Sequence, residues 1–153
     1  MRKRCRRRVW STEINAVAHA IAGACITDSG SLNELRVGEV RSLELMKTGE
    51  AGVQEWQILC DMMNIAEIMG RNGIGPEVLE HCEVANEALH RAAKRYEATK
   101  RMGLSGEGLK ALADIMEYHD LQRTSISRAK YQQMIEKTRN YLKSHGKYVT
   151  HIE

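Results

Sequence analysis

The chain has 153 residues, of which 28% are charged, 42% are hydrophobic and 5% are aromatic, with one proline and no phenylalanine. This length suits a single domain with a buried core, and the scarcity of β-branched and aromatic residues argues against a sheet-rich fold. No apolar run is long enough to span a bilayer, so we expect neither a membrane segment nor export.

Positive charge is concentrated at the start of the chain. Six of the first eight residues are basic: Arg2, Lys3, Arg4, Arg6, Arg7 and Arg8. The whole chain carries a net charge of +3, so the remainder carries −3. Adjacent arginines repel one another and bury nothing. The sequence therefore predicts a flexible basic arm over residues 1–10, a single helical domain over residues 11–146 and a loose tail over residues 147–153.

Two amphipathic helices are expected before the middle of the chain. The first runs from Ser11 or Thr12 to about Cys25 on a stripe of apolar residues at helical spacing. The second begins with the S-x-x-E capping box of Ser31 and Glu34 and closes at Gly49. Its expected apolar positions are Leu32, Leu35, Val40, Leu43 and Met46.

The most apolar stretch, Gln54–Gly70, predicts a central helix. Its apolar residues recur at three- and four-residue steps and cover more than one face, which is typical of a buried helix. The alternative for its methionines is an adaptable binding groove. Gly70–Pro76 then predicts a helix–helix corner, because neither glycine-rich phosphate-binding motif is present.

Three further helices follow the corner. The fourth runs from Pro76 to about Met102, and the cations of its last third stand where a helix dipole favours positive charge. Ser105 and Ser127 are expected to cap the fifth and sixth helices, and Gly146 to end the last one. The sequence as a whole predicts an all-α protein, a compact bundle of five or six helices with a basic N-terminal arm.

No catalytic group, metal site or cofactor is predicted. The cysteines Cys5, Cys25, Cys60 and Cys82 are too far apart for a zinc knuckle or redox dithiol, which favours a reducing cytoplasm. Glu117–Arg123, EYHDLQR, is the densest polar cluster. We expect His119 to face the core and its charged neighbours to be solvated, with an acid–base set or a metal site of Cys60 with His119 as the disfavoured alternatives.

Nucleic acid is the partner that the charge pattern favours. An arginine-rich arm neutralises phosphates and releases counterions with little dependence on base sequence. Lys130, Lys137, Arg139 and Lys143 of the last helix would extend this surface. The alternative is a protein-binding inhibitor or adaptor that uses an apolar helical surface, around Trp56 and the methionines, to bind a host protein or to form a homodimer.

Several short segments resemble small uncharacterised proteins of bacterial phages and prophages. They are the basic start, HAIAGA at His19–Ala24, GIGPE at Gly73–Glu77, and YHDLQR followed by SxSR at Ser125–Arg128. The resemblance implies an accessory factor in the cytoplasm of a bacterial host that binds nucleic acid or a host protein complex. It assigns no reaction and no functional position.

Overall fold

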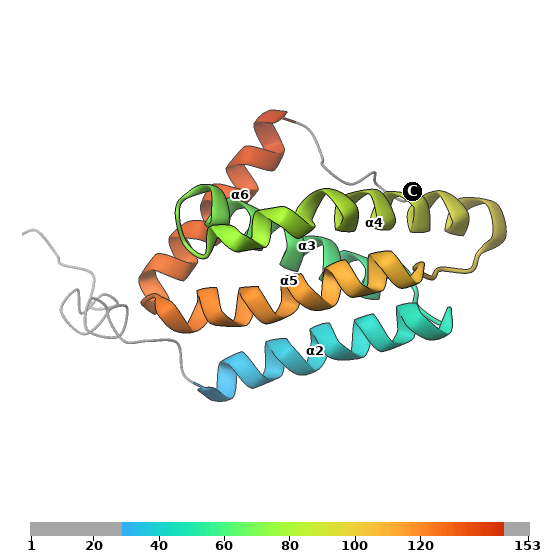
Figure 1. The fold of residues 1–153 in the computed structure, drawn as a ribbon, viewed down its shortest axis with the longest axis horizontal. Helices are drawn as coiled ribbons and strands as arrows, with labels where there is room; N and C mark the ends of the chain where they lie inside the picture. Colours follow the sequence, from blue (N-terminus) through green and yellow to red (C-terminus); the bar gives the residue numbers. More distant parts are fainter. Residues whose placement is uncertain (1–28, 146–153) are drawn as a thin grey trace, which may run out of the picture.

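The structure is a computed structural model that describes residues 29–145. The predicted arm over residues 1–10, the predicted helix over residues 11–25 and the predicted tail over residues 147–153 lie outside this range. Within it the chain forms five α-helices and one short 3-10 turn, and no strand (Figure 1). The elements are α2 (Ser29–Thr48), α3 (Val53–Arg71), η1 (Pro76–Val78), α4 (Leu79–Thr99), α5 (Gly106–Ser125) and α6 (Arg128–His145). The all-α bundle is confirmed.

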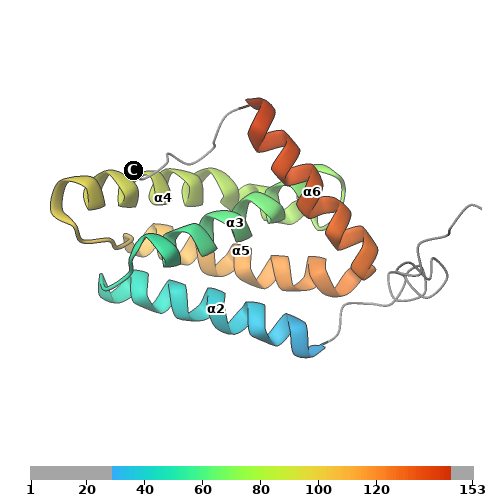
Figure 2. The same cartoon turned by 180° about the vertical axis from the view of Figure 1, so that it is seen from behind.

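Helix α3 is the centre of the bundle. It packs against α2, α4, α5 and α6, and Figure 2 shows it among α2, α4 and α5 with α6 set across one end. Trp56 is only 3% exposed, and its indole nitrogen donates a hydrogen bond of 3.0 Å to the Leu89 carbonyl of α4. Met62, Met63 and Met69 are buried as well, so the methionine run belongs to the core. The alternative of an exposed methionine groove is wrong.

The corner between α3 and α4 forms as predicted. Pro76 opens η1, where its missing N–H leaves no helical bond unmade. Gly75 adopts the left-handed conformation, with φ of 58°, which glycine tolerates best. A Cβ at Gly70 would lie 2.8 Å from Val78, so glycine also permits η1 to lie directly against the end of α3.

The caps of the later helices were also predicted. The Ser105 hydroxyl accepts a hydrogen bond from the Gly108 amide at 3.4 Å, and the Ser127 hydroxyl accepts one from the Lys130 amide at 3.2 Å. Helix α2, however, is already formed at Ser29, the first described residue, so it does not start at the predicted Ser31 capping box.

The fourth helix ends before the predicted Met102. It stops at Thr99 because Lys100 takes the left-handed conformation, with φ of 58°. The chain then turns inward, and Met102 is fully buried beside the backbone of Glu50 and Ala51. The last turn of α4 therefore contains no basic residue, so the helix dipole can account for Lys100 at the C-cap and Arg101 after it but not for Arg91, Lys94 and Arg95.

The apolar stripe of α2 also differs from the prediction. Leu35 is 44% exposed and Val40 is 50% exposed, although both were expected in the core. The buried line contains Leu32, Met46 and, between them, Glu39, which is 5% exposed. A charged residue occupies the buried position because it has an ionic partner on α5.

Candidate nucleic-acid interface and buried polar cluster

The basic residues predicted to contact nucleic acid on the last helix are all exposed on α6. They are Lys130, Lys137, Arg139 and Lys143. Because successive helical residues are rotated by about 100°, Lys130 and Lys137 share one flank of α6. Arg139, two residues after Lys137, is rotated from it by about 200° around the helix axis and shares the other flank with Lys143. The structure therefore divides these cations into two pairs rather than bringing them into one patch.

Part of this charge is engaged within the protein. The Lys137 ammonium donates to the Asn72 side-chain oxygen at the end of α3. Burial raises the pKa of Asp61 on α3, and the nearby Arg139 guanidinium opposes that rise. Cations at these two sites therefore also stabilise the crossing of α6 over α3. The six basic residues of the arm lie outside the described range.

His119 is fully buried, as predicted, and both of its ring nitrogens have partners. Gln122 donates through its side-chain amide to the carbonyls of Ala66 at 3.1 Å and Ile74 at 2.7 Å, so its oxygen is left to accept from His119 Nδ1 at 2.9 Å. The other nitrogen, Nε2, then accepts from the Tyr131 hydroxyl at 3.4 Å. Burial, helped by the charge of Arg123, lowers the pKa of His119 to about 4. The imidazole is neutral, and neither nitrogen is available to a metal or substrate.

The charged neighbours of His119 are not all solvated, which corrects the sequence prediction. Arg123 is completely buried and forms a two-pronged contact with Glu39 of α2, with bonds of 2.9 and 2.8 Å. Asp120 lies 2.6 Å from the same guanidinium and also pairs with Arg36 at 2.6 Å. This cluster connects α2 to α5 through charge-assisted hydrogen bonds.

Burial acts on both members of the Glu39–Arg123 pair. It raises the pKa of Glu39, even though Arg123 opposes the change. Burial alone would lower the pKa of Arg123, but hydrogen bonding and attraction from Glu39 outweigh it, and the pKa is raised. The guanidinium is therefore permanently charged. Sequence reasoning missed the pair, and its only signal was a carboxylate on the line that joins Leu32 to Met46.

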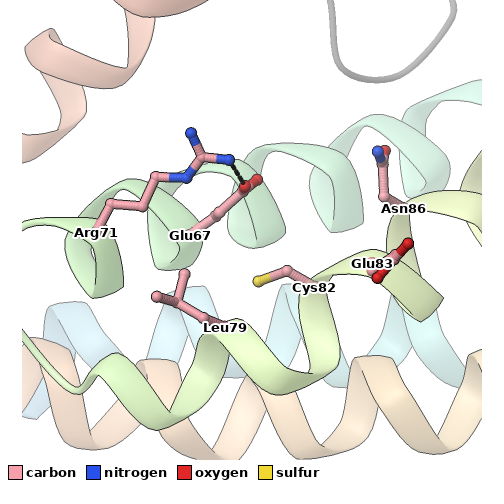
Figure 3. A pocket seen from close by; sticks show the side chains of 6 residues that line it. All are labelled: Glu67, Arg71, Leu79, Cys82, Glu83 and Asn86. Carbon is pink, nitrogen blue, oxygen red and sulfur yellow. Dashed lines mark hydrogen bonds and ion pairs between the residues drawn. The ribbon is translucent and has the colours of Figure 1, made fainter.

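A cleft of about 380 Å³ lies between α3 and α4 (Figure 3). Glu67 and Arg71, which form an ion pair, line its α3 side. On the α4 side the Cys82 thiol donates to the Val78 carbonyl at 3.3 Å. Burial, reinforced by the charge of Glu67, raises the pKa of Cys82 to about 12. The thiol is therefore protonated at neutral pH and is a poor nucleophile.

Two further properties concern the described residues alone. Across residues 29–145, no group of three or more His, Cys, Asp or Glu side chains is placed to hold a metal ion. Over the same residues, no helix has the length and apolar character that a bilayer crossing requires.

Comparison with protein-family models, curated proteins and solved structures finds no match to this chain.

Proposed function

We propose that this protein is a non-enzymatic regulatory or accessory factor of the phage type, which binds nucleic acid or a nucleoprotein complex through its arginine-rich start. The observation that carries the proposal is the contrast between six positive charges in the first eight residues and −3 on the remainder. Such an arm gains free energy by releasing counterions from phosphates. The bundle then gives the arm a folded body, in the cytoplasm of a bacterial host.

The described part of the bundle supports a binding role rather than a reaction. His119, the best-placed general base in the sequence, is buried with both nitrogens occupied. The Cys82 thiol is held in its protonated form. On α6, Lys130 and Lys143 add exposed positive charge on the two flanks. They would extend contacts that the arm begins.

The test compares the full chain with a variant in which all six basic arm residues are replaced by glutamine. Binding to a duplex DNA and a single-stranded RNA of equal length is measured at low and physiological salt. We expect the full chain to bind, with an affinity that falls steeply as salt increases, and the glutamine variant to lose most of this affinity. Equal and negligible binding by both proteins would refute the proposal.

The second candidate is an adaptor that binds a host protein through an apolar helical surface. The surface expected around Trp56 is buried, but Val37 and Val40 of α2 are 67% and 50% exposed, and Leu121 of α5 is 65% exposed. Isolated apolar residues are common on surfaces, so this candidate ranks second. Recovery of one host protein after nuclease treatment, lost on replacing Val37 and Val40 by serine, would favour it.

A further inference from the structure

Within the described part of the chain, the last third of α4 and the two residues after it form a surface of positive charge without ion pairs, called here the α4 end. Its five cations are all exposed: Arg91, Lys94, Arg95, Lys100 and Arg101. Within residues 29–145, no carboxylate lies within ion-pair distance of any of them, although Glu87 and Glu97 stand on the same helix. Residues 88–101 therefore carry a net charge of +4.

The fold gives no structural reason for the charges of Arg91, Lys94 and Arg95. Arg91 and Arg95 are one helical turn apart, and like charges at that spacing destabilise a helix. The dipole of α4 favours Lys100 at its C-cap, but its field falls off within the last turn, which contains no basic residue, so it does little for Arg91, Lys94 and Arg95. Exposed charge of one sign, without a carboxylate partner among residues 29–145, is typical of a surface that attracts a polyanion.

Lys100 adds a second argument. It closes α4 in the left-handed conformation, a position that strongly favours glycine. Its ammonium lies 5.5 Å from the centre of the Tyr96 ring, an exposed arrangement that leaves its hydrogen atoms open to another acceptor. A lysine there costs the turn stability and adds a charge to the cationic surface.

The surface contains a hollow above a close contact between α4 and α5. Arg91, Arg95 and Ser105 line a hollow of about 110 Å³. This volume is several times the ~30 Å³ that one water molecule occupies in liquid. Beneath it Gly108 of α5 packs so closely on Ala88 that an added Cβ would lie 2.4 Å from the alanine methyl group. The two arginines therefore stand on a segment of α4 that is packed closely against α5.

We infer that the end of α4 is a second phosphate-contacting surface, which binds the backbone of a nucleic acid independently of base sequence. This inference rests on the proposed function and deepens it, because it assigns the folded bundle a direct part in binding. The arm attracts the polyanion over a distance, and Arg91, Arg95 and Lys100 fix the bundle against its phosphates. Contacts to phosphate position a protein on nucleic acid without reading its sequence.

The experiment uses the full chain with Arg91→Gln, Arg95→Gln and Lys100→Gly combined. Lys100→Gly removes charge where glycine is favoured, so this change should not lower the melting temperature. Arg41→Gln is the matched control for Arg95→Gln, because both remove one exposed helical arginine that forms no ion pair within the described range. Binding to the same duplex DNA and single-stranded RNA is measured over a salt series for the triple variant, for Arg95→Gln and Arg41→Gln alone, and for the arm variant, in which the six basic arm residues are glutamine.

For duplex DNA, each lost phosphate contact should reduce the slope of log affinity against log salt by about 0.9. The triple variant should thus lose up to ~2.7 from the slope and bind ~10-fold or more weakly at about 0.1 M salt, while Arg41→Gln changes neither. An unchanged slope in a folded triple variant would overturn the inference. If the arm variant still lost binding, the proposed function would stand without it.

Three other results would also overturn the inference. If the unaltered protein binds neither nucleic acid, the proposed function fails and the second surface fails with it. If the triple substitution weakens binding to phosphatidylserine vesicles but leaves nucleic-acid binding intact, the α4 end is a membrane-surface contact. Equal weakening by Arg41→Gln and Arg95→Gln would attribute the effect to net charge rather than to the α4 end.

Discussion

Glu39 and Arg123 form a buried pair whose contribution can be measured by removing each partner alone and both together. The variants are Glu39→Met, Arg123→Met and the double substitution. Methionine fills a similar volume without charge and adapts to irregular space. Arg36 and Asp120, which pair with each other at 2.6 Å, remain in all three variants.

The two single changes should lower the free energy of unfolding by different amounts. Arg123→Met leaves the Glu39 carboxylate, 5% exposed, without its partner, which should cost about 3–5 kcal/mol at neutral pH. Because burial already raises the pKa of Glu39, the carboxylate can take up a proton, and this cost should shrink as the pH falls. Glu39→Met leaves a guanidinium that cannot lose its proton, but Asp120 still lies 2.6 Å away, so about 3 kcal/mol is expected.

The double variant should be within ~1 kcal/mol of the parent, because the desolvation cost disappears together with the attraction. Arg123 Nε also has no hydrogen-bond partner, so replacing this residue sacrifices nothing at that atom. Urea unfolding followed by circular dichroism gives the free energies, with the parent m value as the check on two-state behaviour. Costs that simply add in the double variant would refute the mutual compensation.

Three further predictions concern stability and reactivity. The pKa of His119 falls from 6.5 to about 4 on folding, so its neutral form should contribute its full stabilisation above pH 6.5. The free energy of unfolding should then fall by about 3 kcal/mol as the pH is lowered towards 4. His119→Gln should remove this pH dependence in urea unfolding. Gly108→Ala should lower the free energy of unfolding by ~1–3 kcal/mol, because the added methyl group overpacks against Ala88. Gly38→Ala, which has open space around it, should raise the free energy of unfolding by ~0.5–1 kcal/mol. Melting temperatures of the two variants that shift in the same direction would contradict this prediction. With the other cysteines replaced by alanine, Cys82 should react with a thiol reagent only as fast as the protein opens, and immediate labelling of the native protein would contradict its burial.

Much of the bundle followed from local patterns in the sequence. The core position of Trp56, the corner at Pro76 and the serine caps depend on residues close together in the chain, so spacing and turn chemistry predict them. His119 was placed in the core for the same reason. The prediction that its neighbours are solvated was wrong because the partner of Arg123 lies 84 residues away, on a different helix.

Other errors came from features that have no local signal. The end of α4 was placed too late because Lys100, not glycine, takes the left-handed conformation there. The two apolar residues Leu35 and Val40 were assigned to the core from helical spacing, but the buried line of α2 passes through Glu39. A periodic pattern locates a helix, while the choice of buried face depends on which neighbour packs against it.

Gln122 has a consequence for the order in which the protein matures. Its amide holds the corner between α3 and α4 through the carbonyls of Ala66, Ile74 and Gly75, which precede it by 56, 48 and 47 residues. During synthesis the corner leaves the ribosome well before the residue that fastens it. The hairpin of α3 and α4 must therefore wait, incompletely locked, until α5 emerges and docks.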